Sequence, residues 1–211
     1  MRRTIRLDCY QTIIINQSGY YELTSDITNF CGDYYIYINA SDVILDGKNH
    51  TIDGVGWGTA ILLEDNVRNI TIKNIRLRDW VYGIQGSDCE LLRIENTMIE
   101  DIKYGVWLWG SIYSLTLVNN TISNSECGVD LGVGLINITI TNNTFIENTL
   151  DLQIYGDMSS IEITNNSFSS GMFLIGGYRP PHIDVFANNT IHGKPIVYLD
   201  SKSNITIESA G

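Results

Sequence analysis

An asparagine recurs along this chain at an almost constant spacing. Successive members are 22, 23, 23, 23 and 23 residues apart: Asn74, Asn96, Asn119, Asn142, Asn165 and Asn188. A fixed period of about 20 to 50 residues is typical of a solenoid, in which each repeat is one coil stacked on the previous coil. The chain is therefore predicted to be a repeat protein with one coil for each step.

Apolar residues follow the same repeat. Positions four and two before each asparagine are aliphatic: Ile70/Ile72, Leu92/Ile94, Leu115/Leu117, Ile138/Ile140, Ile161/Ile163 and, in the last coil, Ile205/Ile207. The third position after each asparagine is also apolar, as are the thirteenth and eleventh positions before most of them. Alternation with a period of two indicates strands with one buried face. Three apolar clusters in each repeat predict three short strands per coil, each pairing in parallel with its copies.

The predicted fold is all-β: a single-stranded, right-handed parallel β-helix of about seven coils, with an asparagine ladder and an N-terminal cap. Residues 1–33 fall outside the repeat register and are predicted to form that cap, because an uncovered terminal coil exposes its core and strand edge. Residues 34–211 are predicted to form the helix, and the whole chain one structural domain. The register slips again at residues 178–186, where Asp184 takes an expected apolar position and a bulged loop is predicted.

Composition limits the partners of the chain. A net charge of −11 repels nucleic acid and anionic lipid. No stretch approaches the ~18 consecutive apolar residues that span a bilayer, so no direct membrane insertion is expected. The N-terminal residues lack an apolar signal core, and any targeting segment is expected to lie outside this sequence. A monomer is expected.

The recurring asparagines are interpreted as a turn ladder. Asparagine tolerates left-handed backbone at a sharp turn, and its amide can bond to copies in neighbouring coils. Some of them also begin glycosylation sequons, which we discount because a buried turn amide is inaccessible to a transferase; these are Asn119, Asn142, Asn165 and Asn188. The better glycosylation candidates are Asn16, Asn39, Asn69, Asn137 and Asn204. Nine acceptors in all suit a surface protein.

Several segments resemble a known family. They are CYQTI (residues 9–13), GYYELTSDI (19–27), Cys31, YINASDVILDGKNHTIDG (37–54) and NNTIHGKPIVYL (188–199). The chain resembles, over nearly its whole length, archaeal surface proteins of the NosD-type, so-called periplasmic copper-binding, right-handed β-helix family. The resemblance implies the fold and an extracellular or cell-surface location. It does not imply an activity, because such repeats occur in sugar-binding proteins, polysaccharide-active enzymes and structural ectodomains.

The resemblance also places a cysteine pair in the cap, and it makes Cys9 and Cys31 a disulfide candidate that would staple an element with little core. Cys89 and Cys127 lie at different offsets in coils two steps apart. We expect these two side chains to be small buried groups that do not meet.

The family name suggests copper, which needs His, Cys or Met side chains converging on one point. The three histidines, His50, His182 and His192, lie in different coils or on different sides of a coil. We therefore expect no metal and no cofactor.

One outward strand face is the candidate site. Trp107 and Trp109 project from one coil onto a common face, and their predicted neighbours are Gln85, Asp130, Gln153 and Tyr155. A ring can cover the apolar surface of a sugar while polar neighbours bind its hydroxyls, and two exposed tryptophans would otherwise form a sticky patch. The main hypothesis is an extracellular module, either a carbohydrate-binding domain or a scaffold, whose partner is a glycan or a cell-surface protein. In a pure scaffold, a long loop would cover the tryptophans.

An enzyme is the alternative. Asp130 and Asp151 are predicted to point outward from adjacent coils, with roughly 8 Å between their backbones. That is near the ~6.5–9.5 Å between the carboxyl groups of an inverting glycoside hydrolase. In a chain with 24 Asp and Glu residues, chance alignment is the simpler explanation of such a pair, and the face offers no Arg or Lys base for lyase chemistry.

Overall fold

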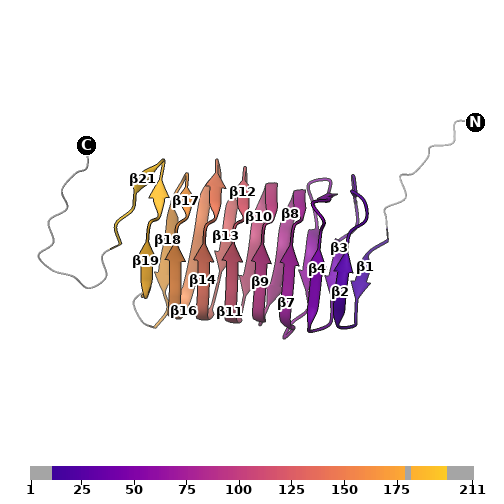
Figure 1. Ribbon diagram of the computed structural model, residues 1–211, viewed down its shortest axis with the longest axis horizontal. Coiled ribbons are helices and arrows are strands. Elements are labelled where there is room, and N and C mark those ends of the chain that lie inside the picture. Colours follow the sequence, from indigo (N-terminus) through magenta and orange to yellow (C-terminus); the bar gives the residue numbers. More distant parts are fainter. Residues whose placement is uncertain (1–10, 179–181, 199–211) are drawn as a thin grey trace, which may run out of the picture.

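The computed structural model describes residues 11–178 and 182–198, and all regular structure in these ranges is β. Figure 1 shows the strands stacked side by side along a rod, with β1 and β2 at one end and β19 and β21 at the other. Each full coil contributes one strand to each of three stacks, because its three apolar clusters turn inward on three sides. The predicted parallel β-helix is confirmed.

The first stack carries the candidate face. Its strands, from the N-terminal end, are β1 (Ile13–Ile15), β3 (Tyr34–Ile38), β6 (Thr59–Leu63), the end of β8 (Arg76–Ser87), the end of β10 (Met98–Trp109), β13 (Cys127–Leu131), the start of β16 (Leu150–Thr164) and β18 (Met172–Gly176). Every pairing in this stack is parallel.

The second stack follows the first along each coil. Its strands are β2 (Gly19–Glu22), β4 (Val43–Asp46), β7 (Arg68–Lys73), β9 (Glu90–Glu95), β11 (Ser111–Val118), β14 (Gly134–Thr141), the end of β16 and β19 (Val185–Ala187). The third stack contains β5 (Thr51–Asp53), the starts of β8 and β10, β12 (Thr121–Ser123), β15 (Thr144–Ile146), β17 (Ser167–Phe168) and β20 (Thr190–Ile191). An antiparallel pairing of β20 with β21 (Lys194–Pro195) lies at the C-terminal end.

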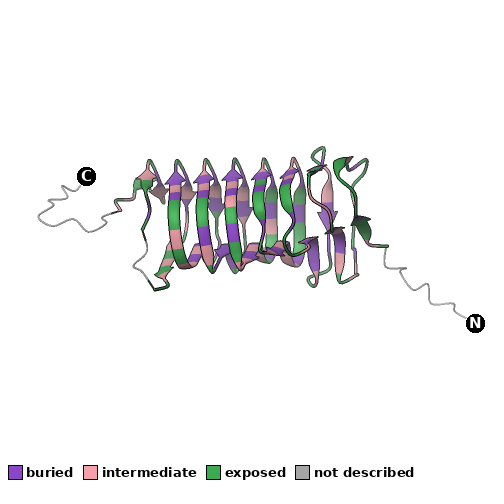
Figure 2. Ribbon diagram, turned by 90° about the horizontal axis from the view of Figure 1, so that it is seen from below, coloured by how far each residue is buried: buried purple, intermediate pink, exposed green. Residues whose placement is uncertain are grey.

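The predicted apolar columns are confirmed by the register. Ile70 pairs with Leu92, and the same column continues through Leu115, Ile138 and Ile161. These side chains are buried, and Figure 2 shows buried and exposed residues alternating along the strands. Successive coils therefore stack aliphatic side chains into one continuous core. The predicted pair Ile205/Ile207 lies outside the described residues.

The predicted asparagine ladder is confirmed in part, since Asn96 donates to Asn74 at 3.3 Å and Asn188 to Asn165 at 3.1 Å, but the fully buried ladder lies one residue further along the chain. The recurring asparagines have left-handed φ values of 51–56°, as a sharp turn requires, but five of the six are exposed and Asn74 is half-buried. The buried ladder is formed by the residues that follow four of them, Asn120, Asn143, Asn166 and Asn189. In this ladder, the amide nitrogens of Asn120, Asn143 and Asn166 each donate to the amide oxygen of the next ladder asparagine at 3.0 Å. The left-handed backbone of the turn asparagine changes the direction of the chain, and the side chain of the next residue then points into the core.

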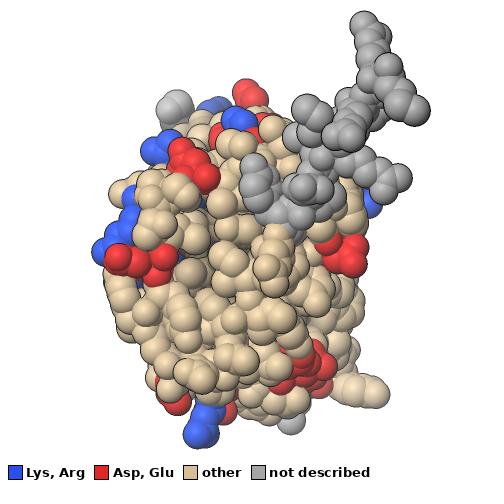
Figure 3. Space-filling view, turned by 90° about the vertical axis from the view of Figure 1, so that its right-hand side faces the viewer, with Lys and Arg blue, Asp and Glu red and all other residues tan. Residues whose placement is uncertain are grey.

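The described part of the predicted cap is itself a coil. Strands β1 and β2 pair in register with β3 and β4, and Ile27 bridges to Ile52. The prediction that residues up to 33 fall outside the register is therefore wrong for this part. The first stack contains eight strands, one from each coil, where about seven coils were expected. The repeat was hidden because its spacing is irregular here. Figure 3, which views this end of the rod, shows charged side chains mainly around the rim.

At the C-terminal end, Asp184 interrupts the apolar column without breaking the register. Ile183 is buried in its place, and Val185 still pairs with Glu162. The Asp184 carboxylate accepts a hydrogen bond from the Ile161 backbone N–H at 2.8 Å. Of the predicted bulged loop, residues 179–181 lie outside the described residues.

Candidate functional site

The six predicted site residues share the outward face of the first stack. Gln85 pairs with Trp107, Trp107 with Asp130, and Asp130 with Gln153, so these four form one column across adjacent coils. Trp109 and Tyr155 lie two residues further along their strands and point to the same side. The register thus brings the predicted residues onto one face, and their role in binding stays a prediction.

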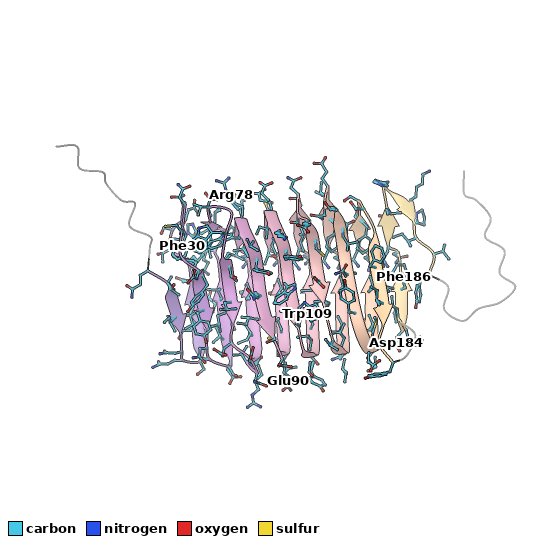
Figure 4. The ribbon with its side chains drawn as sticks, turned by 180° about the vertical axis from the view of Figure 1, so that it is seen from behind. Phe30, Arg78, Glu90, Trp109, Asp184 and Phe186 are labelled. Atoms are coloured by element: carbon cyan, nitrogen blue, oxygen red, sulfur yellow. The ribbon has the colours of Figure 1, made fainter. Side chains whose placement is uncertain are left out.

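Aromatic rings form a continuous chain over this face. Tyr82 and Tyr104 stack with their ring centres 5.4 Å apart, and Tyr82 contacts Trp107 at 5.3 Å. Trp107 contacts Trp109 at 5.8 Å, and Trp109 contacts Tyr155 at 6.1 Å. We name this surface the aromatic face and define it by Tyr82, Gln85, Tyr104, Trp107, Trp109, Asp130, Gln153 and Tyr155. Trp109 lies about halfway along the rod in Figure 4.

A glycine allows the last of these ring contacts. Trp109 and Tyr155 are two coils apart, and Gly132 lies in the coil between them. A Cβ at Gly132 would lie 3.5 Å from the Tyr155 Cβ and 3.8 Å from the Trp109 ring. A larger side chain would occupy the space into which both rings lean, so Gly132 lets aromatic groups from non-adjacent coils meet.

The two tyrosines were missed as site residues in the sequence. Tyr82 and Tyr104 recur at a spacing of 22 residues, and their register pairing shows that they occupy one outward column. That spacing could have placed the two tyrosines on the candidate face. Their contact with the tryptophans could not be predicted from it, because the contact depends on ring orientations across coils.

The exposure of the face differs from the prediction. Trp107 and Trp109 are half-buried, because each is covered by its aromatic neighbours on the same face. Asp130 is only 4% exposed, although its backbone position points outward. A hollow of about 230 Å³ borders both tryptophans and is lined by Leu62, Leu63, Asp65, Gln85, Gly86, Ser87, Trp107 and Trp109.

Asp130 is a buried carboxyl with incomplete hydrogen bonding. Burial raises its pKa above the ordinary value, while a hydrogen bond from Gln153 acts in the opposite direction. Among the described residues, two buried side-chain polar atoms have no hydrogen-bond partner: Asp130 Oδ1 and Trp109 Nε1. Most buried polar groups are satisfied, so each exception needs an explanation. Both exceptions belong to the aromatic face.

The predicted outward orientation of Asp151 is wrong. Asp151 is 0% exposed, and its Oδ2 accepts hydrogen bonds from the backbone N–H groups of Ser169 at 2.7 Å and Ser170 at 2.6 Å. Its Oδ1 accepts a bond from Asn148 Nδ2 at 3.0 Å. The two backbone donors are supplied by the turn into β18, which no sequence spacing revealed, and Asn148 belongs to the coil of Asp151 itself. The Asp130 and Asp151 carboxyls therefore do not form a pair on the aromatic face.

The cysteines partly match the prediction. Cys89 and Cys127 are free, buried and separate, as expected. Burial raises the pKa of each thiol to about 12, with a smaller contribution from nearby carboxylates. Cys31 is disulfide-bonded, and Cys9, its predicted partner, lies outside the described residues.

The histidines are spread along the rod. His50 Nδ1 lies 2.9 Å from an Asp26 oxygen, His182 lies 3.7 Å from Asp184, and His192 is exposed in the C-terminal coil. Within residues 11–178 and 182–198, no three His, Cys, Asp or Glu side chains converge closely enough to hold a metal ion. The same ranges contain no helix that could cross a membrane.

The structure changes the reading of the sequons. Asn16, Asn39, Asn69 and Asn137 are exposed, and Asn204 lies outside the described residues. The four ladder sequons were discounted as buried, but their asparagines are exposed as well. Glycosylation at any of these positions stays a prediction.

Comparison with known proteins gives a family. The family model described as "Right handed beta helix region" matches residues 2–145 and 59–210, which together cover nearly the whole chain. No curated protein and no solved structure matches it. The parallel stacks, the buried columns and this match agree, and the chain belongs to the right-handed β-helix family.

Proposed function

We propose that the chain is an extracellular or cell-surface carbohydrate-binding module, and that the aromatic face is its binding surface. The observation that carries the proposal is the chemistry of that face: a chain of half-exposed rings beside amides, with an unpartnered donor and an unpartnered oxygen beneath. Rings cover the apolar faces of sugars, while amides and carboxyls bind hydroxyls. The resemblance to NosD-type archaeal surface proteins supports the location.

A non-catalytic role fits the face better than hydrolysis. An inverting glycoside hydrolase needs two carboxyl groups on opposite sides of the scissile bond. Asp130 belongs to the face, but Asp151 is fully enclosed by donors from its own coil and the next. We therefore favour binding without turnover.

The test is binding and hydrolysis on a polysaccharide array, followed by calorimetry with the best ligand. The variants are Trp107→Ala/Trp109→Ala and, as a matched control, Tyr113→Ala, which removes an exposed ring from β11 in the second stack. We expect the native protein and the control to bind without releasing sugar. The double variant should bind at least tenfold more weakly, a loss of about 1.4 kcal/mol.

Other outcomes would redirect the proposal. Release of sugar by the native protein would make it an enzyme. Equal losses in the double variant and in Tyr113→Ala would remove the aromatic face as the binding surface. No binding by native protein would leave a scaffold ectodomain, whose partner is a cell-surface protein, as the better account. Circular dichroism of each variant shows whether it is folded.

A further inference from the structure

The aromatic face encloses a carboxyl group, that of Asp130, which has no cationic partner in the part of the chain that the structure describes. Asp130 lies between Trp107 and Gln153 in its column, and its own coil contributes the small residues Cys127 and Gly132 on either side. Tyr155 lies in the next coil, two residues beyond Gln153, the register partner of Asp130, and the Asp130 charge adds to the larger effect of burial in raising the pKa of Tyr155. Asp130 therefore lies beneath a surface of rings, and its Oδ1 has no hydrogen-bond partner among the described residues.

The aromatic face supplies no positively charged side chain to pair with this carboxylate. Its defining residues include neither Lys nor Arg. Lys103 lies at the edge, with its Nζ 5.4 Å from the Tyr104 ring centre, but it already pairs with Glu126 at 3.7 Å. An unpaired buried carboxylate is costly, and a bound cation would remove that cost.

The rings offer the second half of a cation site. The faces of Trp and Tyr are negative, so they attract ammonium groups, and desolvation strengthens this attraction. Asp130 is only 4% exposed, so a ligand would reach its carboxylate only by displacing the rings above it. The net charge of −11 also favours the approach of cationic ligands and disfavours that of acidic polymers.

We propose that the ligand of the aromatic face is a glycan that carries cationic amines, an amino-sugar polymer, and that Asp130 selects it over neutral and acidic glycans. The inference rests on the proposed carbohydrate-binding function and names its ligand class. An ammonium group contacts the Asp130 carboxylate between the rings of Trp107 and Tyr155. The Trp109 Nε1–H donates to a neighbouring sugar oxygen.

The test compares three hexasaccharides by calorimetry at pH 7.5: N,N,N-trimethylated glucosamine, N-acetylglucosamine and galacturonate. Trimethylation keeps the positive charge at every pH, so protonation of the ligand cannot confuse the result. We expect the trimethylated hexamer to bind at least tenfold more tightly than the acetylated hexamer, and the galacturonate hexamer not to bind. Raising NaCl from 50 to 500 mM should weaken binding of the trimethylated ligand alone.

Asp130→Asn is the decisive variant, because it removes the charge and keeps the size of the side chain. We expect it to lose most of the native preference for the trimethylated over the acetylated hexamer, with the small remainder coming from the rings and the net charge of the chain. Tyr113→Ala should keep the native preference. A preference of undiminished size in Asp130→Asn would overturn the role of Asp130.

The two proposals fail in different ways. Equal or tighter native binding of the acetylated or the galacturonate hexamer would overturn the cationic ligand and leave the carbohydrate-binding function intact. A lack of binding to all three hexamers and to every array glycan would overturn both.

Discussion

Three buried aspartates show that neighbouring groups decide what a carboxyl does. Asp151 is satisfied by backbone donors, and Asp130 lies beneath rings with one oxygen unpartnered. Asp46 is the buried last residue of β4, where Lys48 N, Asn74 Nδ2 and the Tyr20 hydroxyl donate to it at 2.9–3.1 Å. Burial alone would raise the pKa of Asp46, but these donors and the Lys48 ammonium lower it to about 2. Asp46 is therefore held as a carboxylate that stabilises the fold.

Asp46 should make stability depend on pH in the acid range. A carboxyl whose pKa is lower in the folded state stabilises the fold above its unfolded pKa of about 3.8, and this contribution is lost as pH falls toward about 2. We expect Asp46→Asn to be less stable than the native protein at pH 7, and the difference to shrink steadily between pH 4 and pH 2. Urea unfolding at a series of pH values measures it.

Glu147→Gln is the control for this experiment, because Glu147 is exposed. Its stability should track that of the native protein throughout the series. A constant difference between native protein and Asp46→Asn down to pH 2 would mean that the donors around Asp46 do not favour its charged form.

At the scale of elements, the turn between the second and third stacks contains two adjacent asparagines with different roles. Asn142 is exposed and adopts a left-handed φ of 55°, while Asn143 is 2% exposed and belongs to the interior ladder. Asn143 Nδ2 donates to the carbonyls of Leu117 and Thr141, and its Oδ1 accepts from the backbone N–H of Asn120. The outer residue makes the turn and the inner residue ties the coils together.

This division predicts unequal effects of two neighbouring substitutions. Asn143→Ala leaves several buried donors and acceptors unpaired, each costing about 1–3 kcal/mol, so we expect a loss of more than about 3 kcal/mol. Asn142→Ala loses about 1–2 kcal/mol through its left-handed backbone, and Asn142→Gly should lose less. Denaturant unfolding of the three variants gives these values, and similar losses at both positions would refute the interior ladder.

The whole molecule is a one-dimensional stack in which coils contact mainly their neighbours. Among the described residues, β2 pairs only with β4 in the second stack, whereas β11 lies between β9 and β14. A central coil is therefore held on both sides and a terminal coil on one.

Hydrogen exchange should follow this arrangement. We expect backbone amides of β9, β11 and β14 to exchange most slowly, and those of β2 and β19 to exchange fastest, because terminal coils open at lower free-energy cost. Mass spectrometry of peptides from exchanged protein measures the gradient. Equal protection in all coils would show that the rod opens as a single cooperative unit.

Much of the fold was determined by the sequence itself. Strand alternation and a 22–23-residue period together predict which residues point inward in each coil. The register is well defined by this pattern because a shift of one residue would turn every side chain to the other face. The same arithmetic correctly brought Gln85, Trp107, Asp130 and Gln153 into one column. Recurrence fails where the period is irregular, and for that reason the first coil was taken for a cap.

Only the tertiary structure decided the state of those side chains. Spacing gives the direction of a side chain but not what covers it or donates to it. The ring contacts over Gly132, the burial of Asp130 and the enclosure of Asp151 by the turn before β18 all depend on atoms from other coils. The sequence thus determined where the face lies, and packing between coils decided its chemistry.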